Sequence, residues 1–225
     1  YCFRLKENSL NFHSSSMSVE NCRKVHKLLM SQKPQYYSGY ARSILLFAQI
    51  LKQEGLKLPN PKAILCFGET VTSDMRQKLE LTYNAQVFDF YGHTENAVLV
   101  CESPLHNKYL VEDYFYPELI DEKGIVTLEK RGELVGTSFY NYAMPLIRYK
   151  TRDYITLATK KAEENINFKT VHEIEGRKDD YITTPDGRTL FLAEGAINYA
   201  QGIVTAQYIQ EQPDTLIINL VTDST

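Results

Sequence analysis

The amino-terminal part of the chain carries a helical pattern of apolar positions. Apolar side chains recur at helical spacing in two segments. The first is capped by Ser18 and ended by Pro34, and the second follows a turn at 36–40 and stops at Gly55. The pattern therefore predicts two amphipathic helices before residue 56.

The next segment has the pattern of a β-α-β unit. Apolar runs at 62–67 and 85–91 predict short buried strands. Between them lies a helical segment that Ser73 is expected to cap and Asn84 to terminate. The two strands should be parallel, so that their carboxyl ends meet at one edge of the sheet.

After residue 107 the pattern changes to short apolar runs separated by turns, which predicts an antiparallel sheet or a distorted barrel. These runs are 109–116, 125–128, 132–139, 146–149 and 154–158. Asp186-Gly187 predicts a hairpin turn. A helix at 194–201 and strands at 204–211 and 215–221 are expected to open a small α+β domain. The predicted class is α/β: a parallel β-α-β core, an antiparallel sheet or barrel, and the start of this small domain.

Composition narrows the class of protein. The 225 residues are 43% hydrophobic and 24% charged, which is typical of a globular protein. A net charge of −3 argues against a nucleic-acid-binding surface. Four scattered cysteines favour free thiols in a reducing cytoplasm. No signal peptide is visible and the longest apolar run, 44–48, is too short to span a bilayer, so no membrane partner is expected.

The segment 87–95 is the first candidate for chemistry. Gly92 interrupts an apolar strand and allows the backbone to turn or to approach a ligand closely. The polar side chains displayed there are Asp89, Tyr91, Thr94 and Glu95. Thr94 could donate to a phosphate oxygen and Glu95 could bind Mg²⁺. Alternatively, Thr94 is a helix N-cap and Glu95 lies in the first helical turn, which local sequence alone favours.

Three further clusters, 132–137, 145–153 and 175–182, are each weak on their own. Arg148 and Asp153 could form a strand-end ion pair, and 177–180 could be a solvated turn. Together with 87–95, however, the order and spacing of these clusters resemble the adenylate-forming (acyl- or aryl-CoA synthetase) superfamily, in particular phenylacetate–coenzyme A ligases and proteins of capsular-polysaccharide clusters.

The resemblance covers about residues 34–225 and is carried by ordered motifs. The matching segments are 91–95 (YGHTE, for YGxTE), 113–120 (DYFYPELI), 132–135 with 145–149 (GELV and PLIRY) and 176–180 (GRKDD, for GRxDD). The resemblance implies that residues 1–176 are the C-terminal part of the large domain and that residues 177–225 are the start of a small mobile domain.

The resemblance also implies a nucleotide-binding site, with ATP or AMP as ligand. Asp89 would bind the adenine amino group, Tyr91 would stack on the ring, and Gly92 would allow close backbone approach. The turn Gly68-Glu69-Thr70 would wall the other side of the ring.

The same resemblance implies the catalytic roles. Thr94 would bind the α-phosphate, Glu95 the Mg²⁺ ion, and Asp153 both ribose hydroxyls. Arg177 would contact ribose or phosphate, and Asp179 would be the hinge of the small domain.

The implied reaction has two steps. A substrate carboxylate attacks the α-phosphorus of ATP and releases pyrophosphate, and then a thiol of coenzyme A or a carrier attacks the acyl-adenylate. Two anions must meet in the first step, so Mg²⁺ and hydrogen-bond donors must neutralise and orient them. No side-chain nucleophile is required.

Several features depart from the family pattern. The Gly-rich phosphate loop is absent, so this chain should bind AMP better than it turns over ATP. Arg152 replaces the glycine that precedes the ribose-binding Asp. Cys101 and His106 are two candidate zinc ligands, but the further cysteines that a structural zinc site needs are missing, so no structural zinc is predicted. His93 occupies the variable motif position, where it either lines the acyl pocket or has no role.

Three hypotheses follow. The first is the larger part of an AMP-forming ligase for an aromatic or other organic acid, with a small-molecule acid and a nucleotide as partners. The second is acyl or adenylyl transfer in capsular polysaccharide biosynthesis. The third is a non-catalytic fragment that binds a nucleotide or a protein partner. An oligomer is compatible with all three.

Overall fold

The computed structural model describes residues 2–4, 9–13, 17–127, 129–159, 165–177, 181–187, 189–191 and 203–222. The chain forms two units, residues 1–92 with 101–106, and residues 93–100 with 107–225. Strand β6 (Leu99–Glu102) contributes residues to both.

The first unit is built on three parallel strands in the order β3-β4-β5. They are β3 (Tyr36–Gly39), β4 (Ala63–Phe67) and β5 (Gln86–Gly92). Helix α2 (Ala41–Gln53) connects β3 to β4, and helix α3 (Ser73–Tyr83) connects β4 to β5. A short hairpin of β1 (Cys2–Arg4) and β2 (Ser9–Asn11) precedes them. The predicted parallel β-α-β core is confirmed.

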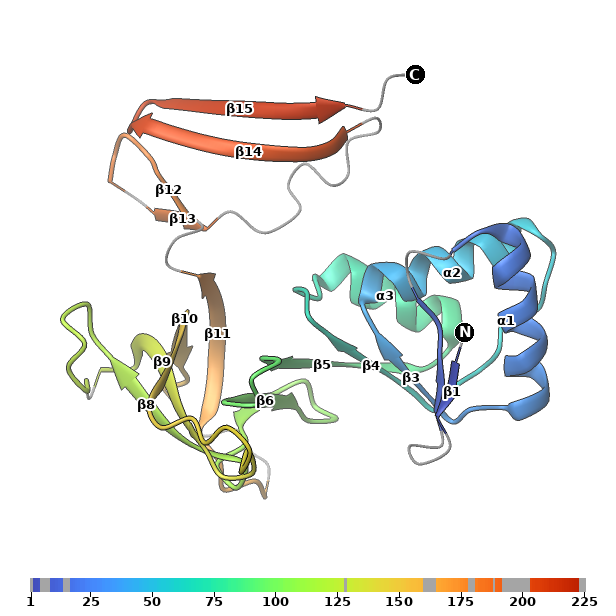
Figure 1. Cartoon of the computed structure of the whole chain (residues 1–225), viewed down its shortest axis with the longest axis horizontal. Helices are drawn as coiled ribbons and strands as arrows, with labels where there is room; N and C mark the ends of the chain where they lie inside the picture. The colour runs from blue at the N-terminus through green and yellow to red at the C-terminus, as the bar shows by residue number, and fades with distance from the viewer. Residues whose placement is uncertain are drawn as a thin grey trace. The chain divides into compact units, whose positions relative to one another are not determined.

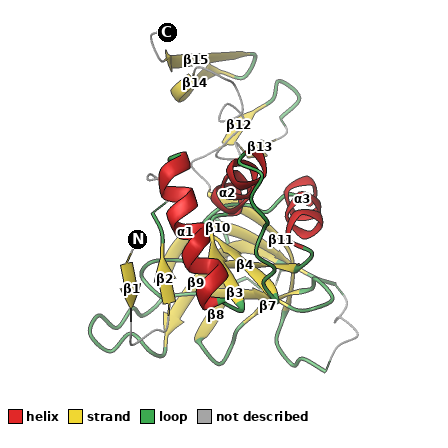
Figure 2. Cartoon of the chain, turned by 90° about the vertical axis from the view of Figure 1, so that its right-hand side faces the viewer, coloured by secondary structure: helices red, strands yellow, loops and turns green. Residues whose placement is uncertain are grey.

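Helices α2 and α3 pack on β4 and β5 (Figure 1). The core between them contains Ala48 from α2, Leu79 from α3, and Ile64 and Val87 from the strands, all fully buried. Helix α1 (Val19–Gln32) packs on the other side of α2 through Cys22 and Val25. These three are the helices of the described chain (Figure 2).

Most of the expected helix boundaries in this unit are confirmed. Ser18 caps α1, α2 ends just before Gly55, and left-handed Asn84 ends α3. Two expectations were wrong. The cap of α3 is Thr72, whose hydroxyl accepts from the Met75 N–H, because Ser73 is already the first residue of the helix. The segment 36–39 is a strand, since it finds a parallel partner in β4.

The second unit contains an antiparallel sheet with the order β7-β11-β10-β9-β8. The strands are β7 (Lys108–Leu110), β8 (Phe115–Ile120), β9 (Arg131–Ser138), β10 (Tyr149–Leu157) and β11 (Thr170–Arg177). The antiparallel sheet expected after residue 107 is confirmed. In detail, a turn splits the expected run 109–116. Strand β10 contains 154–157 but only Tyr149 of the expected run 146–149, which is otherwise not a strand. Within 125–127, Val126 forms an isolated bridge with Ile120.

Two further hairpins follow the sheet along the chain. Strands β12 (Tyr181–Thr183) and β13 (Thr189–Phe191) flank the Asp186-Gly187 turn, as predicted. Strands β14 (Ile203–Gln212) and β15 (Thr215–Thr222) form the second hairpin. The Gln210 side chain binds both the N–H and the carbonyl of Thr183. The helix expected at 194–201 lies outside the described residues.

Within the described segments, none of the helices is both long and apolar enough to cross a bilayer.

Candidate functional site

The turn after β4 and the end of β5 lie at the same end of the parallel strands. Phe67 pairs with Phe90, which brings Gly68 and Tyr91 to neighbouring positions, as the sequence predicted. Gly68 has φ +77°, and a Cβ there would lie 2.6 Å from Tyr40 Cε1. Only glycine therefore fits this turn without displacement.

The Glu69 carboxylate in this turn is occupied by helix α2. It accepts from the Arg42 backbone N–H at 2.8 Å and lies 3.2 Å from the Arg42 guanidinium. The helix has no side-chain cap at Tyr40, so Glu69 takes over that function and stabilises the positive end of the helix. At a ligand site on this turn, Glu69 would therefore contribute its backbone and not its carboxylate.

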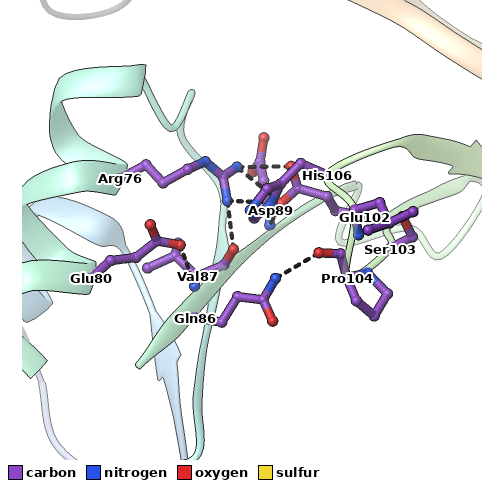
Figure 3. A network of polar contacts seen from close by, with 10 residues as sticks. Arg76, Glu80, Gln86, Val87, Asp89, Glu102, Ser103, Pro104 and His106 are labelled. Atoms are coloured by element: carbon purple, nitrogen blue, oxygen red, sulfur yellow. Dashed lines mark hydrogen bonds and ion pairs between the residues drawn. The ribbon is translucent and has the colours of Figure 1, made fainter. Parts of the chain in front are cut away.

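Asp89 is buried in β5 and is held by a residue that sequence reasoning missed. Its backbone N–H donates to Glu102 Oε2 at 2.7 Å. Glu102 in turn accepts two bonds from Arg76 of α3, at 2.8 and 2.9 Å, and His106 lies 3.4 Å away (Figure 3). A lone Arg and a lone Glu separated by 26 residues give no local signal of this contact.

Thr94 and Glu95 form a turn in the second unit and not the start of a helix. Asn96 adopts φ +55° and its N–H bonds the His93 carbonyl, which closes the turn. The helix-cap interpretation of Thr94 was therefore wrong. The Glu95 carbonyl accepts from the Asn141 side chain at 3.0 Å, and its carboxylate accepts from the Tyr149 hydroxyl at 3.1 Å.

Asp153 lies in the same unit, on β10, and is buried. Its carboxylate is 3.0 Å from His93 Nε2, and its backbone N–H donates to the Thr151 hydroxyl. Arg177 is its partner residue across the strand pair with β11. The second unit thus brings together Glu95, Asp153 and the backbone of Arg177. The Arg177 side chain and Asp179 lie outside the described structure.

Two arginines near Asp153 have left-handed backbones, which is uncommon for non-glycine residues. Arg148 has φ +51° and Arg152 has φ +64°. Arg148 forms its ion pair with Glu118 at 3.0 Å, not the expected one with Asp153. Arg152 has a left-handed conformation, which glycine adopts without steric cost, and its N–H donates to the Glu133 carboxylate.

The chemistry of the donor set fits a hard cation bound together with phosphates. Glu95 provides a carboxylate and Thr94 a hydroxyl in the same turn, and Mg²⁺ is commonly held by one or two carboxylates plus substrate phosphates. Across the ranges that the structure describes, no group of three metal-ligating side chains occurs. Burial raises the pKa of the Cys101 thiol to about 11.

The sequence is similar to curated proteins, although no model of a known protein family matches it. Phenylacetate-coenzyme A ligase of Pseudomonas putida is 29% identical over 174 residues, 74% of this chain and 39% of that protein. Protein CapK of Staphylococcus aureus is 25% identical over 222 residues, 95% of this chain and 48% of that protein.

Solved structures share the fold. A 2-hydroxyisobutyryl-CoA ligase in complex with R3-HIB-AMP superposes with a TM-score of 0.69 at 21% identity, covering 88% of this chain and 45% of that one. The anthranilate CoA ligase AuaEII in complex with anthranoyl-AMP gives 0.61 at 11% identity, covering 90% and 42%.

The chain is similar in sequence to phenylacetate-coenzyme A ligases and to Protein CapK, and it shares the fold of adenylate-forming ligases. The resemblance of the motifs is thereby confirmed. This chain spans less than half the length of these proteins.

Proposed function

We propose that the protein containing this chain is an ATP-dependent, AMP-forming ligase that activates an organic acid as its acyl-adenylate. Coenzyme A or a carrier thiol would then accept the acyl group. One observation carries the proposal. Glu95 and Asp153, from motifs more than fifty residues apart, are bound by the side chains of Tyr149 and His93, whose rings pack on each other. Aromatic acids are the first class to test, because relatives are named phenylacetate- and anthranilate-CoA ligases.

The residues of the second unit would act on the phosphate and ribose. The substrate carboxylate oxygen bonds to the α-phosphorus while the bond to pyrophosphate breaks, and the leaving group carries the electron pair away. The Thr94 hydroxyl would donate to the α-phosphate, Asp153 would accept from the ribose hydroxyls, and Arg177 would donate to ribose or phosphate. Glu95 would hold Mg²⁺, which when bound neutralises phosphate charge.

The residues of the first unit would hold the base. Asp89 is fixed in β5 by its backbone bond to Glu102, and would accept from the adenine amino group. Tyr91, Gly92 and the 68–70 turn follow the ends of adjacent strands, where open α/β sheets bind ligands. Asp179 remains the proposed hinge between the large and small domains.

A second candidate is acyl or adenylyl transfer in capsular polysaccharide biosynthesis. The match to Protein CapK, over 95% of this chain, favours testing it. In that case AMP would still be released or transferred from ATP, but the acceptor would be a sugar hydroxyl or amine instead of a thiol.

The decisive experiment is acid-dependent ATP–pyrophosphate exchange by the full native polypeptide, with a panel of aromatic and aliphatic acids. We expect exchange with at least one acid, and a loss of about 100-fold or more in Glu95→Gln, because the neutral amide is a poor Mg²⁺ ligand. Tyr149→Phe is the matched control: it keeps the Glu95 carboxylate and removes only its phenol donor. Absence of exchange with every acid, together with absence of AMP binding, would reject the ligase and leave a partner-binding module.

A further inference from the structure

His93 occupies the variable position of the 91–95 motif, yet its ring is held on two sides. The side chain is only 11% exposed. Its Nε2 lies 3.0 Å from Asp153 Oδ2. An ionised carboxylate only accepts hydrogen bonds, so Nε2 carries the proton in this contact.

The second contact fixes the plane of the ring. Tyr149 packs edge to face against His93, with centroids 6.3 Å apart and an interplanar angle of 89°. The same tyrosine donates its hydroxyl to Glu95. His93 therefore cannot rotate away from Asp153 without disturbing the ring that contacts the Glu95 carboxylate.

Asp153 depends on such a contact because the strand around it is irregular. Its pairing with β9 shifts between Lys150 and Tyr154, and its pairing with β11 shifts between Tyr154 and Ile155. The preceding residue, Arg152, has a left-handed backbone. Where the ladder is irregular, side-chain hydrogen bonds contribute more to the direction of a side chain, and the bond to His93 is one that Asp153 makes here.

We propose that His93 is a positioning residue that holds the Asp153 carboxylate in the orientation that receives the ribose hydroxyls. The inference rests on the proposed nucleotide-binding function and extends it to a residue outside the motif's fixed positions. A carboxylate has two oxygens with about four acceptor positions, so Asp153 accommodates His93 and a ribose hydroxyl together. His93 thereby makes the site selective for ribonucleotides over nucleotides without ribose hydroxyls.

The test compares binding of AMP and of 2′,3′-dideoxy-AMP to the full native polypeptide by calorimetry. The wild-type protein should prefer AMP. His93→Leu should weaken AMP binding about tenfold, the value of one hydrogen bond to a charged group, and should leave dideoxy-AMP binding unchanged. His93→Gln should retain most of the preference, because its terminal amide places a donor near the position of Nε2. His93→Asn has the same amide on a shorter stem and should lose the preference.

The alternative outcomes are distinct. If the wild-type protein binds neither nucleotide, the proposed function fails and this inference fails with it. If AMP binds, but His93→Leu weakens both nucleotides equally, His93 has only a structural role and the inference alone is overturned. If His93→Leu does not fold, the comparison of His93→Gln with His93→Asn decides: equal preference for AMP in both variants overturns the proposal.

Discussion

At the scale of single residues, Gly136 fixes the loop that follows the candidate site. It lies on β9 opposite Tyr149 of β10. A Cβ on Gly136 would lie 2.5 Å from Val98 Cγ1 and nearer still to the Ala97 carbonyl oxygen. Glycine is therefore required here so that the 97–98 segment can lie directly on the sheet, within a few residues of Glu95.

We expect Gly136→Ala to lower the free energy of unfolding by about 2 kcal/mol, because the backbone of Ala97 cannot move aside as a flexible side chain could. Urea denaturation measures the change. Gly55→Ala is the matched control. Its φ of +67° strains any alanine by about 1 kcal/mol, but nothing lies within 4 Å of its Cβ. A loss at Gly136 no larger than that at Gly55 would contradict the steric explanation.

The sequence predicted candidate site residues but not how they are held. Glu95 and Asp153 stood out because their motifs match a family pattern in order and spacing. The contacts of His93 with Asp153 and of Tyr149 with Glu95 join residues 60 and 54 positions apart. Only the pairing of strands determines which side chains meet over such separations, so no local pattern could have shown them.

At the scale of elements, Arg76 joins helix α3 to two strands. Its guanidinium donates to the Val87 carbonyl of β5 and to both oxygens of Glu102 of β6 (Figure 3). The Glu102 side chain is only 2% exposed. A buried carboxylate of this kind requires its partner, since an unpaired charge in the interior is strongly unfavourable.

We expect Arg76→Met to destabilise the chain by about 3 kcal/mol, because it leaves the Glu102 charge buried without its guanidinium. Lys78→Met, two residues along the same helix, breaks an exposed pair with Asp74 and should cost under about 0.5 kcal/mol. Urea midpoints of the two variants provide the comparison. Similar small losses in both would show that Glu102 is solvated or neutral.

Elements with strong local signals were the ones that the sequence predicted well. Helices α1 and α3 have side-chain caps, all three helices have an apolar face, and the Asp186-Gly187 hairpin has a turn dipeptide. Strands β3, β6 and β11 were missed. Their backbones become strands because a neighbour supplies hydrogen bonds: in β3, Tyr36–Gly39 pairs with β4, although Tyr-Ser-Gly alone is typical of a turn.

At the scale of the whole molecule, the first unit buries several weakly acidic groups. Burial, and secondarily the negative charges of Asp89 and Glu69, raises the pKa of the Cys66 thiol to about 12. Burial raises the pKa of Cys101 to about 11. It also raises the pKa of the Tyr37 and Tyr83 hydroxyls above their ordinary value. These groups stay protonated in the folded chain at pH values where the unfolded chain ionises.

This difference predicts a loss of stability at alkaline pH. A raised pKa in the folded state gives stability that is complete below the unfolded pKa, near 9 for a thiol, and is lost as pH rises toward the folded value. We expect the free energy of unfolding to fall between pH 8.5 and 10.5, and Cys66 should account for about 1.5 kcal/mol of this loss. Urea denaturation across this range measures it.

Cys66→Ala is the control for that measurement. The smaller side chain lowers stability at every pH, but it removes one ionising group, so its stability should fall less steeply than that of the wild type. Parallel pH profiles for the two proteins would exclude the thiol as a source of the alkaline effect.

The hairpin of β14 and β15 has a consequence for handling the polypeptide. Every residue from Thr215 to Thr222 is exposed, including Ile217 and Ile218, which point to opposite faces of the ribbon. Apolar side chains on both faces of a two-stranded ribbon are the features by which strands stack into aggregates. Aggregation in concentrated samples will therefore depend on this hairpin. The substitution Ile218→Lys should reduce it, because a charge on the strand opposes stacking.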